Sequence, residues 1–160
     1  MSQLYRNPEL IAPSSITNQT TGSFTGTVSD CQTMFDGNEL IYNEDNSSPY
    51  MDFDFNFTNI RELWGLTFRM FYDGTHTVRV KIIDVAGAKE DIIYIIPPNI
   101  AEYTTVRTLF LPPLIQANYI GTGGSKGNVT VSVIHDTGGG GNTNHDCHTD
   151  YIALLGRRFA

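Results

Sequence analysis

The chain has 160 residues, of which 40% are apolar and 11% are aromatic, and this composition predicts one folded domain and excludes a disordered segment. There are 10 Lys and Arg against 17 Asp and Glu, and the net charge of −7 argues against nucleic acid as the main partner. No apolar run approaches the roughly 20 residues of a membrane-spanning helix, so we expect no membrane partner either.

Residues 1–22 are polar, contain two prolines and show no helical periodicity, so we interpret them as an extended or flexible N-terminal arm. Residues 23–160 are expected to form a single domain. The start of the chain lacks the positive and apolar regions of a secretion signal, which leads us to expect synthesis and assembly in a host cytoplasm. Cys31 and Cys147 are too few for a disulfide scaffold and are predicted to be free thiols.

Strict alternation of apolar and polar residues over 51–57 is the clearest structural signal in the chain. Successive side chains of a β-strand point to opposite faces, so Met51 and the three phenylalanines at 53, 55 and 57 are predicted to be buried. The intervening Asp52, Asp54 and Asn56 are predicted to form a solvated face. A catalytic carboxylate pair at Asp52 and Asp54 is the less favoured alternative.

Further short strands are predicted along the chain, separated by turn residues at intervals of about 10 residues. Asp36-Gly37-Asn38 and Asp73-Gly74 are two of the turns. This spacing predicts an all-β protein, an antiparallel β-sandwich of jelly-roll-like form with about nine or ten short strands. The other predicted strands are 24–28, 39–42, 63–72, 77–84, 92–96, 104–111, 115–120, 129–135 and 151–155.

Three phrases of the sequence, at 35–38, 49–55 and 66–74, resemble jelly-roll domains of the carbohydrate-binding-module or galactose-binding-like type. A fourth, from His135-Asp136-Thr137 through the glycines at 138–141 to Tyr151-Ile152-Ala153-Leu154, is similar to the closing hairpin of jelly-roll domains in structural proteins of tailed-phage virions. The resemblance spans about residues 24–155 and implies the architecture more strongly than an activity.

Metal-ligating residues gather in His145-Asp146-Cys147-His148, where His145, Cys147 and His148 are candidate zinc ligands. We favour a loop leading into a strand, because neighbouring strand residues point to opposite faces and cannot all converge on one ion. Oxygen ligands for a calcium ion are offered by Asp36, Asn38 and Asp45, together with Glu44, but ordinary polar turns are the favoured interpretation. We therefore predict no cofactor and no metal.

Trp64, Tyr50 and Tyr72 are the candidate contacts for a ligand or partner. Trp64 lies beside Gly65 on a predicted strand and is expected in the core or at a subunit contact more than as a platform for sugar rings. No serine nucleophile elbow, H-E-x-x-H or C-x-x-C motif is present, so we expect no enzymatic activity.

These features together predict a structural protein of a tailed-phage virion, most simply a capsid decoration or cement protein. Such a protein would bind the major capsid protein across capsomers, stabilise the head by mass action and form a homotrimer. The alternatives are an adhesion module of a tail or fibre, or a carbohydrate-binding module with a glycan as its partner.

Overall fold

The structure is a computed structural model, and it describes residues 8–20, 22–44, 51–74, 77–84, 89–97, 105–112, 120, 127–135 and 145–160. Across these residues the chain forms 11 strands and one short 3-10 helix, η1 (Val28–Cys31). The strands pair antiparallel in two sheets, which confirms the predicted β-sandwich. In the described part of the chain, no helix is both long and apolar enough to cross a membrane.

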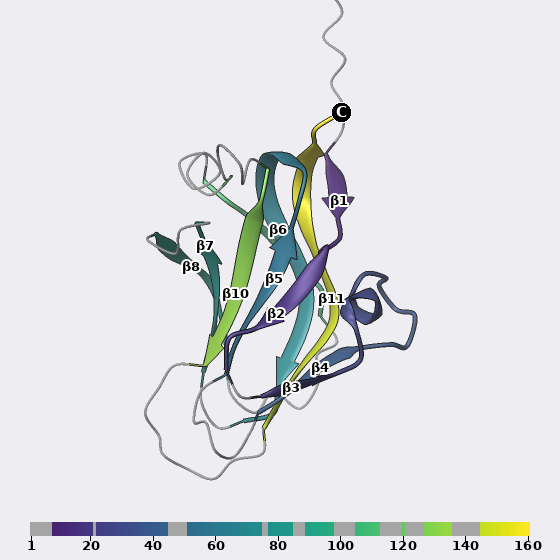
Figure 1. Cartoon of the computed structure of the whole chain (residues 1–160), viewed down its shortest axis with the longest axis vertical. Coiled ribbons are helices and arrows are strands. Elements are labelled where there is room, and N and C mark those ends of the chain that lie inside the picture. The colour runs from purple at the N-terminus through teal and green to yellow at the C-terminus, as the bar shows by residue number, and fades with distance from the viewer. Residues whose placement is uncertain are drawn as a thin grey trace, which may run out of the picture.

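The first sheet is built around the C-terminal strand. It contains β1 (Glu9–Ile11), β3 (Ser23–Thr25), β4 (Leu40–Asn43), β6 (Ile60–Tyr72), β9 (Arg107–Phe110) and β11 (Asp146–Arg158). Their order is β3-β4-β11-β6-β9, and β1 pairs with the far end of β11. The two 13-residue strands β6 and β11 pair side by side and are the longest strands of the sandwich (Figure 1).

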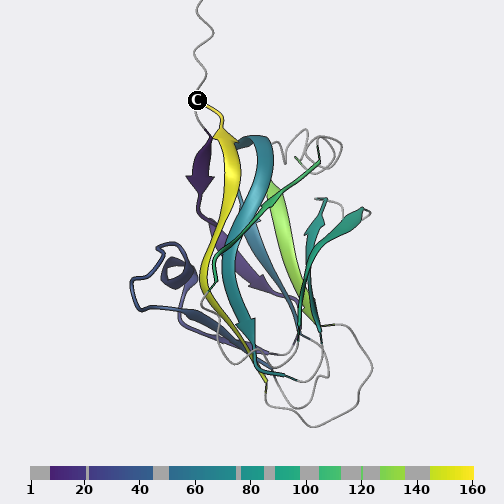
Figure 2. The same cartoon turned by 180° about the vertical axis from the view of Figure 1, so that it is seen from behind.

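The second sheet has the order β2-β5-β10-β7-β8. Its strands are β2 (Ser15–Asn18), β5 (Asp52–Phe57), β7 (Val78–Ile83), β8 (Glu90–Ile96) and β10 (Val129–His135). The two views from opposite sides show this sheet packed against β6 and β11 (Figures 1 and 2). Strands that follow each other in the chain are therefore often in different sheets, as a jelly roll requires.

The core lies between the two sheets, and alternation along the strands decides which side chains enter it. Phe53, Phe55 and Phe57 of β5 are fully buried, as the alternating pattern predicts. Val131 of β10 lies in the row of Phe55, and Val80 of β7 lies in the row of Phe53; both valines are also fully buried. Phe53 stacks on Tyr42 of the first sheet, with ring centroids 4.8 Å apart, so aromatic contacts join the two layers.

Irregular pairing in the first sheet explains why β11 is longer than the strand predicted at 151–155. The register between β11 and β6 shifts at Thr149/Tyr151 and again at Leu155/Gly156. Each shift changes which face the following residues point to, so the apolar pattern of β11 does not alternate along its length. Gly65, predicted to mark a bulge, lies directly opposite Leu155, at the second shift.

The N-terminal residues form two strands that pair with strands of the sandwich, which differs from the free arm expected from the sequence. Within residues 8–20, β1 extends the first sheet and β2 forms an edge of the second. The backbone here is extended, as predicted, but both strands belong to the sandwich. The predicted strand at 24–28 is shorter, because it ends at Thr25 and is followed by η1. The predicted strand at 115–120 lies almost entirely outside the described residues.

Candidate functional site

The side chains of the second sheet that point away from the core form an outer face with three rows, of which two cross five strands and one crosses four. The central row runs Thr17, Asp54, Ser132, Lys81 and Ile92, in the order of the strands. One flanking row contains Asp52, Ile134, Arg79 and Ile95, and the other contains Ser15, Asn56, Thr130, Ile83 and Glu90. We call this surface the outer face of the second sheet.

Three polar residues at the centre of this face are nearly inaccessible to solvent. Asp54 is 7% exposed, Ser132 is 2% exposed and Lys81 is 8% exposed, although all three point away from the core. The prediction that Asp52, Asp54 and Asn56 form a solvated face is therefore wrong for Asp54. Asp52 and Asn56 in the flanking rows stay partly exposed.

Asp54 is held by one hydrogen bond and leaves its second carboxylate oxygen unused. Gln19 Nε2 donates to Asp54 Oδ2 at 3.0 Å. Asp54 Oδ1 is buried and receives no hydrogen bond from the described residues. A buried carboxylate oxygen without a donor costs free energy in a folded protein, so this atom marks a position where an external donor would be stabilising.

Asp52 lies two residues from Asp54 on the same side of β5. Ser132 Oγ donates to Asp52 Oδ1 at 3.3 Å. Burial raises the pKa of Asp52, the charge of Asp54 raises it further, and the Ser132 hydrogen bond and the Lys81 charge partly oppose the rise. Lys81 Nζ donates to both carboxylate oxygens of Glu90 at 3.0 Å, so its own charge is paired within the face.

This arrangement suits ligand binding more than acid–base catalysis. Asp52 and Asp54 project side by side from one strand, whereas the carboxylates of a glycosidase lie on opposite sides of the bond that they cleave. The carboxylate oxygens at the centre of the face are hydrogen-bond acceptors. Gln19, Ser132 and Lys81 donate to some of them. A ligand rich in hydrogen-bond donors would complete the set of hydrogen bonds.

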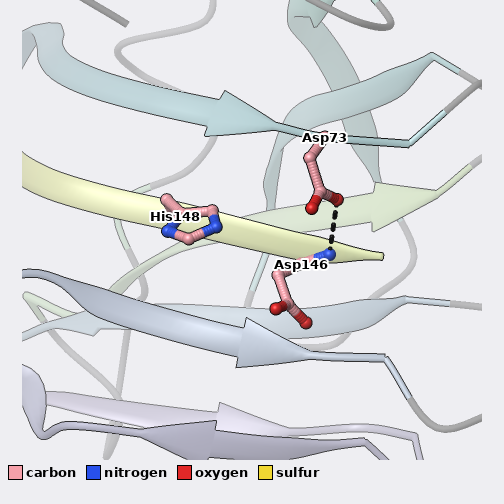
Figure 3. A group of neighbouring side chains, drawn as sticks. All are labelled: Asp73, Asp146 and His148. Carbon is pink, nitrogen blue, oxygen red and sulfur yellow. Dashed lines mark hydrogen bonds between the residues drawn. The ribbon is translucent and has the colours of Figure 1, made fainter. Parts of the chain in front are cut away.

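The predicted zinc ligands do not converge. Cys147 is fully buried in the core, where desolvation raises the pKa of its thiol, and it points away from His148. His148 instead lies near Asp146 and Asp73, and one ligand atom from each of the three falls within 4.8 Å of the others (Figure 3). His145 Nδ1 is 3.6 Å from Asp73 Oδ1 and stands beside this group.

Each of the three clustered side chains is also held from another direction. Asn43 Nδ2 donates to Asp146 Oδ1 at 3.1 Å, and the Asp146 amide donates to Asp73 Oδ1 at 2.7 Å (Figure 3). His148 Nδ1 lies 3.2 Å from Glu39 Oε1. The cluster therefore ties the end of β6 to the start of β11, which is a structural role.

Two of the predicted calcium ligands, Asp36 and Asn38, lie in one turn. Asp36 Oδ1 accepts a hydrogen bond from the Asn38 amide at 3.0 Å, as in an ordinary Asx turn. Glu44 is buried, and its amide donates to the His145 carbonyl at 3.1 Å. Asp45 lies outside the described residues.

Two of the three predicted contact residues can be located. Tyr72 is fully buried and edge-on to His145, and burial together with the Glu44 charge raises the pKa of its hydroxyl, so it is a core residue. Trp64 is half-buried, with the Arg157 guanidinium 5.1 Å from the ring centroid. Tyr50 lies outside the described residues.

Trp64 belongs to a second surface, on the opposite side of the sandwich. Leu10, Leu155, Gly65 and Phe110 are cross-strand neighbours in the first sheet, next to Trp64. Phe110 is 76% exposed and Leu10 is 55% exposed. This apolar row is the main alternative to the outer face of the second sheet as a place where a partner binds.

Comparison with known proteins identifies the fold. No family model and no curated protein matches the chain. A family 29 carbohydrate-binding module complexed with mannohexaose matches with 13% identity and a TM-score of 0.55, over 92% of this chain and 90% of that chain. A second structure of a family 29 module matches with 12% identity and a TM-score of 0.55, over 92% and 87%.

A weaker match is the enzymatically active domain of tailspike protein 4 of bacteriophage CBA120, with 13% identity and a TM-score of 0.40, over 94% of this chain and 19% of that chain. The two stronger matches confirm the expected jelly-roll fold of the carbohydrate-binding-module type. At this level of identity they establish the fold and leave the ligand to be argued from this chain's own residues.

Proposed function

We propose that this protein is a glycan-binding module whose ligand lies across the outer face of the second sheet. The observation that carries the proposal is the carboxylate of Asp54, which is nine-tenths buried and has an oxygen that receives no donor from the described residues. Sugar hydroxyls supply closely spaced donors, and they would complete the hydrogen bonds of this carboxylate.

The shape of the face supports an extended ligand. The central row crosses five strands, and neighbouring strands are about 4.8 Å apart, so the row spans roughly 19 Å. That length accommodates several sugar units. The isoleucines at 83, 92, 95 and 134 lie between the polar groups and would contact the apolar faces of sugar rings.

The fold supports the same proposal. Two proteins with this jelly roll are named carbohydrate-binding modules, and one of them is complexed with mannohexaose. A sandwich of this kind is therefore able to hold an oligosaccharide. We propose a binding role without catalysis, and an adhesion module of a virion is one setting for it. The roles as a capsid decoration protein and as a homotrimer stay predictions from the sequence.

Binding of a panel of neutral, amino and acidic oligosaccharides, measured by isothermal titration calorimetry, tests the proposal. The wild-type protein is expected to bind at least one class. Asp54→Ala is expected to abolish binding while circular dichroism shows an unchanged β-sheet spectrum. Phe110→Ser, on the opposite face, is the matched control and is expected to bind as the wild type does.

Two results would contradict the proposal. If the folded wild-type protein binds no oligosaccharide in the panel, the function is wrong. If Phe110→Ser loses binding and Asp54→Ala keeps it, the apolar row of the first sheet is the site and the outer face of the second sheet is not.

A further inference from the structure

We propose that the ligand of this face carries free amino groups, so that the protein prefers an amino sugar to the N-acetylated or acidic form of the same sugar. The inference rests on the proposed function and specifies its ligand.

The charged groups of the face come from three strands. Asp52 and Asp54 lie on β5, Arg79 and Lys81 on β7, and Glu90 on β8. The described residues of β2 and β10 that point outward are uncharged, so the face holds three carboxylates and two cations. Lys81 is bonded to both oxygens of Glu90, which leaves Asp52 and Asp54 as neighbouring negative charges on β5, with Arg79 two strands away across β10.

The hydrogen bonds of this carboxylate pair are incomplete. Asp54 receives one donor, from Gln19, and Asp52 receives one, from Ser132, while Asp54 Oδ1 receives none from the described residues. Gln19 is an exposed residue that follows β2, so a ligand can replace its amide at Asp54 without disturbing the sheet. An ammonium group brings three donors and a positive charge to the same place.

Electrostatics then favours an amine over the alternatives. The two carboxylates already repel each other, which is seen in the pKa of Asp52, raised by burial and by the charge of Asp54. A positive charge about 5 Å from the pair relieves this repulsion, and Coulomb's law at intermediate screening makes that worth about tenfold in affinity. A uronic acid would add a third negative charge and is expected to be excluded.

The experiment compares four hexasaccharides of matched length by calorimetry at about pH 6, where an amine of this class is largely protonated. They are the glucosamine hexamer, the N-acetylglucosamine hexamer, mannohexaose and the galacturonate hexamer. The glucosamine hexamer is expected to bind about tenfold more tightly than its N-acetylated form. The preference is expected to shrink at about 0.5 M salt.

Charge-neutralising variants separate this site from general attraction of a cation to an acidic protein. Asp54→Asn and Asp52→Asn are expected to lose the preference for the amine, with mannohexaose binding reduced less. Asp36→Asn removes the same charge from an exposed turn away from the face, and it is expected to keep the full preference.

The possible failures are distinguishable. If the N-acetylated or galacturonate hexamer binds as tightly as the glucosamine hexamer, the inference is overturned and the proposed function stands. If Asp36→Asn lowers the preference as much as Asp54→Asn does, the attraction is non-specific and the inference is again overturned. If none of the four hexamers binds the folded protein, the proposed function fails with it.

Discussion

Replacing Asp52 with Asn is expected to stabilise the protein at neutral pH, although the residue belongs to the proposed site. Asp52 and Asp54 are alternate residues on one strand, so their β-carbons are about 7 Å apart. At the screening found near protein surfaces, two negative charges at this distance repel each other by about 2 kcal/mol. Burial of Asp52 is the larger cause of its raised pKa, and repulsion by Asp54 adds to it, whereas the Ser132 bond and the Lys81 charge partly oppose the rise.

The raised pKa fixes the pH dependence. The folded protein binds the Asp52 proton more tightly than the unfolded chain, so the wild type carries no penalty from this residue below the unfolded pKa of about 3.9. The penalty grows as the pH rises through the folded pKa. The advantage of Asp52→Asn, measured by urea unfolding, should therefore be largest near neutral pH and vanish in acid.

Asp36→Asn is the matched control, because its side-chain oxygen still accepts the bond from the Asn38 amide. It is expected to change stability by less than about 0.5 kcal/mol. The repulsion between these carboxylates would be refuted if Asp52→Asn were less stable than the wild type near neutral pH. It would also be refuted if the difference in the free energy of unfolding between variant and wild type were the same at every pH.

Three further predictions concern the scaffold. Gly156→Ala should cost about 2 kcal/mol or more in urea unfolding, because the new β-carbon would lie 2.1 Å from the Glu62 carbonyl oxygen of the paired strand; a neutral effect would contradict the tight pairing. Phe55→Ala should cost about 3–5 kcal/mol in the same assay, since the ring is fully buried, and a loss below 1 kcal/mol would place it outside the core. Thiol reagents should modify neither cysteine until urea unfolds the protein, because burial raises the pKa of both thiols, that of Cys31 to about 12; labelling of the native protein would contradict this burial.

Alternation made the second sheet predictable. The strands at β5, β7 and β10 follow the pattern of apolar and polar residues closely, and so the identity of their buried residues follows from the sequence. A period of two survives wherever one face packs on the core and the pairing is regular. The alternating pattern therefore sufficed to predict the class of fold.

The site was less predictable, because its residues meet through pairing between distant parts of the chain. Lys81 approaches Asp54 only because β10 lies between β5 and β7, which brings Ser132 between the two. The order of strands in a sheet cannot be predicted from the pattern of apolar and polar residues within any one strand. Asp54 alone therefore resembles a solvent-exposed residue, and its burial depends on Gln19 and Ser132, which are 35 and 78 positions away in the chain.

The irregular pairing of β11 with β6 also limited what could be predicted from the sequence. Three register shifts interrupt the pairing of β11 with β6, so the alternating pattern reveals only the central part of β11 and hides the segment from Asp146 to Asp150. The interpretation of His145 to His148 as a loop followed from that limit. Short polar strands such as β1 and β2 are equally hidden, because their stability comes from the strands that they pair with.

The pairing of β1 with β11 has a practical consequence for how the module could be mounted. Glu9 lies opposite Gly156, and Glu9 Oε1 accepts a hydrogen bond from the Arg158 amide at 2.8 Å, so the first and last described strands leave the sandwich together at one pole (Figure 1). A tether attached at either end would therefore hold the molecule by the same pole, with its broad sides free. Immobilisation on a sensor chip through one end or the other should give the same response to a glycan in the assay of the proposed function. A short peptide should also be able to link the two ends, so that the chain can be opened at another loop as a circular permutant.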